Sequence, residues 1–112
     1  MTALITGASS GIGLELSRIC AARGHDVVLV ARGARNLAEL AAALERDHRV
    51  RAQVIAADLS TTAGVERVVG RVEELRFTID VLVNNAGFGV YGPFVETLLE
   101  TEQTRWRGVA SP

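Results

Sequence analysis

Four short apolar runs recur along the chain, and each is continuous rather than alternating with polar residues. They cover residues 3–5, 27–30, 54–57 and 81–83. Continuous runs rich in Val, Ile and Leu are typical of strands that are covered on both faces, as in a parallel sheet. The pattern therefore predicts four buried strands.

Three segments with helical spacing separate these runs, at residues 11–23, 35–47 and 61–76. Their apolar side chains recur at intervals of three and four, which places them on one face of a helix. The predicted inner positions are Leu16, Ile19, Cys20, Leu37, Leu40, Ala41, Leu44, Val65, Val68, Val69, Val72 and Leu75. The order β-α-β-α-β-α-β predicts an α/β fold with an open parallel sheet that is truncated after the fourth strand.

The last predicted strand has a consequence for association. With no strand expected after residues 81–83, its apolar edge would face solvent. We therefore expect weak stability of the isolated chain, or self-association through this edge.

The clearest chemical signal is the glycine-rich turn between the first strand and the first helix. Gly7, Gly11 and Gly13 allow a tight turn and a close backbone approach to a pyrophosphate. The helix that follows directs N–H groups and the positive end of its dipole at the phosphates. Ser9 and Ser10 add hydroxyl donors. The strand–turn–helix context predicts a Rossmann-type dinucleotide site, with a tight turn that binds no ligand as the alternative.

The choice of cofactor is read at the end of the second strand, about 20 residues beyond the glycine turn. An acid at that point would bond to the ribose 2′-hydroxyl of NAD, but the chain has Arg32 there and no acid. A planar guanidinium suits a 2′-phosphate. We therefore expect NADP(H) to be preferred to NAD(H), and the alternative is a solvated loop arginine.

Three motifs follow the first, third and fourth strands in order. They are Thr6-Gly7-Ala8-Ser9-Ser10-Gly11-Ile12-Gly13, then Asp58-Leu59, then Asn84-Asn85-Ala86-Gly87. Together they make residues 1–96 resemble the short-chain dehydrogenase/reductase family of the classical type. The resemblance implies that the cofactor phosphates are surrounded by Gly7, Ser9, Ser10, Ile12 and Gly13.

The same resemblance assigns roles to the other two motifs. It implies that Asp58 accepts a hydrogen bond from the adenine amino group and that Leu59 lies beside the adenine ring. It implies that Asn85, Ala86 and Gly87 line the ribose next to the nicotinamide.

The resemblance further implies hydride transfer aided by Asn, Ser, Tyr and Lys, with the tyrosine as general acid or base. The sequence contains no lysine, and its one tyrosine, Tyr91, is followed four residues later by Val95. We therefore assign no catalytic residue and expect no turnover from this chain alone. Three interpretations remain open: part of an NADP-dependent oxidoreductase, a non-catalytic dinucleotide-binding module, or a truncated or frame-altered product without independent function.

The chain divides on this view into two parts. Residues 1–96 are the expected dinucleotide-binding segment, and residues 97–112, which follow a change in composition, are an expected divergent and poorly ordered tail. The substrate is not assigned.

Composition limits the partners. The net charge is −1, with 12 basic and 13 acidic residues intermixed, so we expect neither nucleic acid nor a membrane surface as a partner. No apolar run approaches the roughly 20 residues of a transmembrane helix. Because the sequence opens directly on a strand-like run, we expect no signal peptide. A single cysteine, Cys20, excludes an internal disulfide and a cysteine metal cluster. These features favour a cytoplasmic protein without a metal.

Overall fold

The computed structural model describes residues 1–8, 11–76, 79–83 and 108–110. The elements are β1 (Thr2–Thr6), α1 (Gly11–Ala22), β2 (Asp26–Ala31), α2 (Ala34–His48), β3 (Ala52–Ala56), α3 (Thr62–Leu75), β4 (Val81–Val83) and β5 (Gly108–Ala110). The predicted alternation of strands and helices is confirmed as far as Val83, with the ends of the elements shifted by one or two residues.

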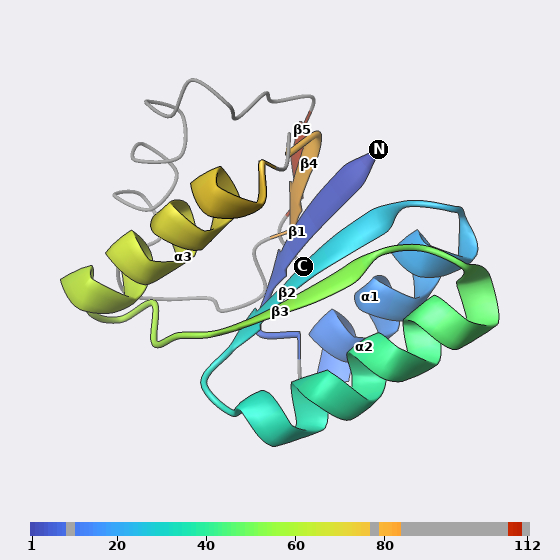
Figure 1. Ribbon diagram of the computed structural model, residues 1–112, viewed down its shortest axis with the longest axis horizontal. Helices are drawn as coiled ribbons and strands as arrows, with labels where there is room; N and C mark the ends of the chain where they lie inside the picture. The colour runs from blue at the N-terminus through green and yellow to red at the C-terminus, as the bar shows by residue number, and fades with distance from the viewer. Residues whose placement is uncertain (9–10, 77–78, 84–107, 111–112) are drawn as a thin grey trace.

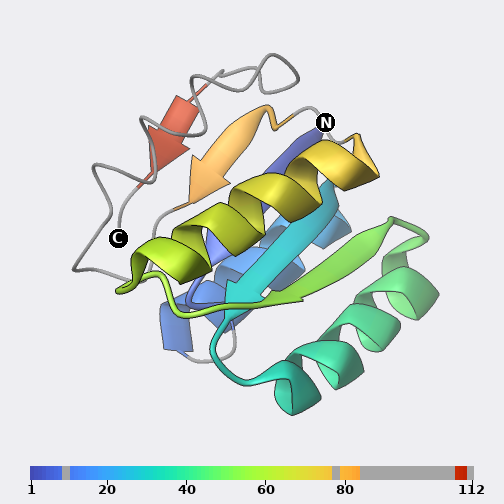
Figure 2. The ribbon, with the colours of Figure 1, turned by 60° about the vertical axis from the view of Figure 1, so that its left-hand side comes forward.

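The sheet is parallel throughout, with the strand order β3-β2-β1-β4-β5. Strand β1 lies at the point where the connections change direction, because β2 and β3 follow on one side of it and β4 on the other. Helices α1 and α2 cover one face of the sheet, and α3 covers the opposite face (Figures 1 and 2). The chain is thus a Rossmann-type three-layer fold.

Strand β5 was not predicted from the sequence. It pairs in parallel with β4, with Leu82 opposite Val109. The edge on this side of the sheet is therefore β5, which corrects the prediction of an open edge at Val81–Val83. Gly108–Ala110 has only three residues and shows no periodic pattern, so its pairing with β4, rather than its own sequence, identifies it as a strand.

Two apolar clusters, one on each face of the sheet, form the core. On the first face, Ile5 and Leu29 pack with α1 and α2; on the second, Leu4 and Val28 pack with α3. Successive residues of a strand point to opposite faces, so neighbours in β1 and β2 enter different clusters. Each buried Leu, Ile or Val contributes about 1.5–3 kcal/mol relative to an exposed one. The inner positions predicted for α2 and for the valines of α3 are buried, as expected.

Helix α1 confirms the predicted inner face only in part. Leu16 and Cys20 are partly buried and pack against the first cluster, as expected. The buried residues of the helix are Gly13, Ser17 and Ala21, whereas Ile19 is 46% exposed. Small residues four positions apart let the helix lie close to the strands, an arrangement that a search for large apolar side chains overlooks. Among the helices that the structure describes, none is both long and apolar enough to cross a membrane.

The amino ends of the strands are tied together by two aspartates. The amide of Asp80 donates to the carbonyl of Thr2 over 2.9 Å, and the Asp80 carboxylate accepts from the Thr2 amide over 2.9 Å. Asp26 in the same way donates its amide to Met1 O and accepts from the amide of Arg51. Both aspartates use their polar groups for neighbouring backbone, which closes this edge of the sheet.

The Asp80 carboxylate supports a test of this arrangement. Asp80→Ala removes an acceptor of the amide of Thr2, a residue that is only 8% exposed. A buried donor left without its acceptor costs about 1–3 kcal/mol, so the free energy of unfolding should fall by that amount. Asp80→Asn should cost less, because its amide oxygen can still accept. Urea denaturation followed by circular dichroism measures both. In the control, Asp47→Ala on the surface of α2, stability should barely change, and an equal loss there would contradict the assignment.

Candidate functional site

The residues that the sequence nominates gather at the carboxyl ends of β1, β2 and β3. Gly7 follows β1, Arg32 follows β2 and Asp58 follows β3, and these strands are neighbours in the sheet. Figure 2 shows the connections that carry Arg32 and Asp58 leaving β2 and β3 at the same edge of the sheet. In open α/β sheets, ligands bind in the crevice outside this edge, where the strand order reverses.

The glycine turn adopts backbone angles that other residues rarely adopt. Gly7 has a φ of 61° and Gly11 a φ of 51°, both in the left-handed region. The amide of Ala8 donates to the carbonyl of Val30 over 3.2 Å, which fixes the turn against the end of β2. Gly13 is buried, while Ile12 is 56% exposed. Ser9 and Ser10 lie outside the described residues.

A threonine hydroxyl bridges the two strands at the reversal point. Thr6 is buried, and its Oγ1 donates to the carbonyl of Val83 over 3.5 Å, the long end of hydrogen-bonding distances. It thereby connects the last residue of β1 to the last residue of β4. The sequence reasoning missed this role, although a polar residue that ends a buried strand is a signal for it. Asn85, Ala86 and Gly87, predicted to act just beyond Val83, lie outside the described residues.

The turn after β3 is held by hydrogen bonds to the side-chain carboxylate and to the backbone carbonyl of Asp58. The carboxylate oxygen Oδ1 accepts from the amide of Ser60 over 2.9 Å and from its hydroxyl over 2.6 Å. The Asp58 carbonyl accepts from the amide and the hydroxyl of Thr61. The Thr61 Oγ1 in turn accepts from the amide of Gly64 over 3.0 Å and so caps α3. These bonds fix where the Asp58 carboxylate lies.

The environment of Asp58 favours its charged form. The two hydrogen bonds from Ser60 lower the pKa of the Asp58 carboxyl, and the nearby positive charge of Arg32 lowers it further. Among the described residues, both hydrogen bonds to this carboxylate, from the amide and the hydroxyl of Ser60, go to Oδ1, so Oδ2 can accept from a ligand. Leu59, the next residue, is half-buried and packs against the apolar cluster beneath α3.

Gly64 lets the first turn of α3 approach the Asp58 turn closely. A Cβ atom added at this glycine would collide with the backbone carbonyl of Asp58 and crowd Oγ1 of Thr61. By contrast, a Cβ at Gly70, two turns later in the same helix, would meet no atom within 4 Å. Sequence reasoning did not single out Gly64, because a glycine inside a helical pattern signals a close approach only once its neighbours are known.

Arg32 lies beside a helix start that has no side-chain cap. Arg32 and Gly33 are exposed, and Gly33 is the extended N-cap residue of α2, with φ −97° and ψ 118°. An uncapped helix N-terminus directs amide hydrogens and the positive end of the helix dipole outwards. Together with the guanidinium, this arrangement favours an anion at the end of β2.

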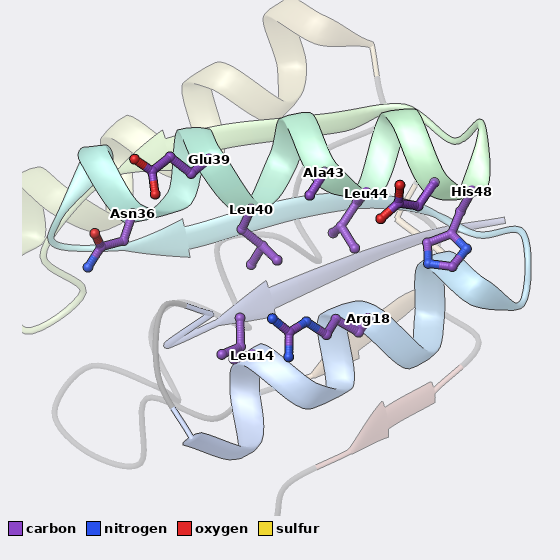
Figure 3. A pocket seen from close by; sticks show the side chains of 9 residues that line it. Leu14, Arg18, Asn36, Glu39, Leu40, Ala43, Leu44 and His48 are labelled. Atoms are coloured by element: carbon purple, nitrogen blue, oxygen red, sulfur yellow. The ribbon is translucent and has the colours of Figure 1, made fainter.

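A hollow lies away from this edge, in the groove between α1 and α2. It has a volume of about 440 Å³, and Figure 3 shows side chains of the two helices facing each other across it. Its lining residues are Leu14, Arg18, Asn36, Glu39, Leu40, Ala43, Leu44, Asp47 and His48. None of the predicted cofactor-binding residues lines this groove, so it is separate from the candidate site.

Comparison with known proteins identifies the family. The family model "short chain dehydrogenase" matches residues 1–110, so the chain belongs to the short-chain dehydrogenase family. This confirms the relationship that the three sequence motifs predicted.

Curated relatives share about two fifths of the aligned residues. The very-long-chain 3-oxoacyl-CoA reductase of Meyerozyma guilliermondii is 41% identical over 99 residues, which cover 85% of this chain and 28% of the relative. The meso-2,3-butanediol dehydrogenase of Serratia marcescens is 36% identical over 107 residues, which cover 96% of this chain and 40% of the relative. The chain thus spans well under half the length of these relatives.

Solved structures show the same fold. The L-sorbose reductase of Gluconobacter frateurii, complexed with NADPH and L-sorbose, is 44% identical with a TM-score of 0.74. That match covers 79% of this chain and 34% of the reductase. A short-chain dehydrogenase from Sphingobium yanoikuyae in complex with NADPH is 46% identical with a TM-score of 0.69, covering 78% of this chain and 34% of the other.

The Ser60 hydrogen bonds give a pH-dependent prediction. Ser60→Ala removes the hydroxyl donor to Asp58 and leaves the amide donor, so the pKa of the Asp58 carboxyl should rise toward its ordinary value. A lowered pKa in the folded state stabilises the fold above the unfolded-state pKa, and this stabilisation is lost as the pH falls through the folded-state pKa. The stability difference between the parent and Ser60→Ala should therefore vanish in acid.

Carboxyl carbon NMR titration and urea denaturation at several pH values measure these two effects. Thr62→Ala, an exposed change at the start of α3, is the control and should leave the Asp58 titration where it is. An unchanged Asp58 pKa in Ser60→Ala would contradict the assignment of the hydroxyl bond as its main cause.

Proposed function

We propose that residues 1–96 form the NADP(H)-binding segment of a short-chain oxidoreductase that interconverts carbonyl and alcohol groups. The observation that carries this proposal is Arg32, which stands exposed at the end of β2 beside the uncapped start of α2. This position lies at the carboxyl ends of the strands, on the same side of the sheet as the glycine turn that leads from β1 into α1. NADP differs from NAD by a 2′-phosphate. A guanidinium together with the amide hydrogens at an uncapped helix start is well suited to bind this group.

The glycine turn would hold the pyrophosphate. The left-handed angles of Gly7 and Gly11 bring the backbone close to the ligand without interference from a side chain. The amino end of α1 supplies amide hydrogens and a favourable dipole, to which Ser9 and Ser10 add hydroxyl donors in this proposal. Exposed Ile12 would cover the same part of the cofactor.

Asp58 would bind the adenine. Its carboxylate is held by Ser60 and kept ionised, and Oδ2 can accept from the exocyclic amino group. Leu59 would contact the ring with the part of its side chain that the core does not cover. We propose further that Asn85, Ala86 and Gly87 line the ribose next to the nicotinamide.

Two solved relatives support the choice of cofactor. The sorbose reductase and the Sphingobium dehydrogenase, at 44% and 46% identity, are both complexed with NADPH. The curated relatives named above are a 3-oxoacyl-CoA reductase and a butanediol dehydrogenase, which supports carbonyl or alcohol substrates as the general class.

The division of labour follows from what these residues can do. When bound, NADPH would supply the hydride for reduction of a carbonyl carbon. The residues at the carboxyl edge would bind and orient the cofactor and fix which end of it lies beyond β4. Neither Arg32 nor Asp58, both placed toward the adenine end of the cofactor in this proposal, is assigned a proton-transfer role, and we assign no catalytic residue.

The role of Arg32 is tested by comparing the two cofactors. The chain should bind NADPH more tightly than NADH, and Arg32→Ala should remove most of that preference. A charge-assisted hydrogen bond contributes about 1.5–3 kcal/mol, so the loss should be roughly tenfold or more in NADPH affinity, with little change for NADH. Isothermal titration calorimetry measures all four dissociation constants.

The control is Arg71→Ala, which removes an exposed arginine of α3 that pairs with Glu74. It should leave both affinities unchanged. Equal affinity of the parent for NADPH and NADH, or an undiminished preference in Arg32→Ala, would refute the proposed recognition of the 2′-phosphate.

A further inference from the structure

Strand β3 forms one edge of the sheet, since the strand order is β3-β2-β1-β4-β5. An edge strand presents backbone N–H and C=O groups to which a strand from another molecule can pair. Proteins that avoid such pairing usually obstruct the edge with charged side chains, bulges or proline.

The printed hydrogen bonds show which groups of β3 face outwards. The carbonyl of Arg51 accepts from Val27 over 2.9 Å, and the amide of Ala57 donates to Ala31 over 3.0 Å, so both point toward β2. The direction of the backbone groups alternates from residue to residue along a strand. The groups of Ala52, Val54 and Ala56 therefore face away from the sheet.

Two charged side chains occupy the ends of this outward row. Oε2 of Glu45, near the end of α2, accepts from the amide of Ala52 over 3.3 Å. Nε of Arg67, in α3, donates to the carbonyl of Ala56 over 2.8 Å. The helices α2 and α3 lie on opposite faces of the sheet (Figure 1), so the edge is reached from both sides.

A strand added to β3 would need the same groups. Whether parallel or antiparallel, it must pair with the outward groups of Ala52, Val54 and Ala56, and it would have to displace a carboxylate at one end and a guanidinium at the other. Between the two blocked atoms, the carbonyl of Ala52, both groups of Val54 and the amide of Ala56 stay available, which leaves a template at the short end of strand lengths.

We propose that Glu45 and Arg67 act as a pair of edge guards that prevent copies of this chain from joining through β3. The two side chains carry opposite charges, so removing both leaves the net charge of the chain at −1. Neither residue belongs to the cofactor site proposed above, so this inference stands apart from the proposed function.

The test is the double variant Glu45→Met/Arg67→Met in the full 112-residue chain. Methionine keeps the length and helix propensity of both side chains but removes their charge and hydrogen bonds. The matched control, Glu39→Met/Arg71→Met, makes the same two changes at solvent-accessible positions of the same helices that form no hydrogen bond with β3 among the described residues. Sedimentation velocity over a concentration series should show self-association about tenfold tighter in the double variant than in the parent or the control.

Hydrogen exchange at Val54 locates the association. In the double variant, protection of the Val54 amide should rise with protein concentration, because its outward N–H enters the new strand pair. Association as weak as in the parent would overturn the proposal, and so would association without protection of Val54 or equal association of the control.

The single variants keep the test decisive if the double variant does not fold. Glu45→Met and Arg67→Met should each tighten association about threefold and protect Val54 at high concentration. If neither single variant shows concentration-dependent protection of Val54, the proposal fails.

Discussion

Strand β1 is buried along its whole length between β2 and β4, and the rest of the fold depends on this position. With β1 at the centre, the connections through α1 and α2 lie on one face of the sheet and the connection through α3 on the other. The carboxyl ends of β1, β2 and β3 then meet at one edge, beside the point where the strand order reverses. Residues from three separate segments converge there because the topology requires it.

The two ends of the strands differ in the use of their polar groups. At the amino ends, the carboxylates of Asp26 and Asp80 accept hydrogen bonds from neighbouring backbone amides and tie the strands together. At the carboxyl ends, Gly7 and Gly11 turn the chain sharply, Arg32 is exposed, and Asp58 is held ionised by Ser60. At the amino ends, the aspartates therefore satisfy backbone groups within the sheet, whereas at the carboxyl ends charges and amide hydrogens are directed outwards.

The sequence predicted the sheet well, because continuous apolar runs at the spacing of β-α units leave few other arrangements. It predicted the inner face of α1 only in part. Leu16 and Cys20 pack against the core as expected, but Ile19 is exposed and the fully buried residues are the small Gly13, Ser17 and Ala21. It also missed β5, whose residues Gly108–Ala110 owe their strand geometry to pairing with β4.

The site could be foreseen only in part, and for the same reason. Local motifs identified the glycine turn, Arg32 and Asp58, and the structure places all of them at one edge. The bridge from Thr6 to Val83 and the close approach of Gly64 to Asp58 depend on tertiary neighbours that no local pattern reveals. The contacts of Glu45 and Arg67 with β3 belong to the same class.

The central claim is that a dinucleotide lies across the carboxyl ends of the strands. Two-dimensional amide NMR of the labelled chain during titration with NADPH tests it most directly, because each backbone amide reports its own surroundings. The account predicts saturable shifts at Gly7, Gly13 and Asp58, with Asp26 and Asp80 at the opposite edge unchanged. Shifts confined to the amino edge or to the groove between α1 and α2, or no saturable shift at Gly7 and Gly13, would contradict it.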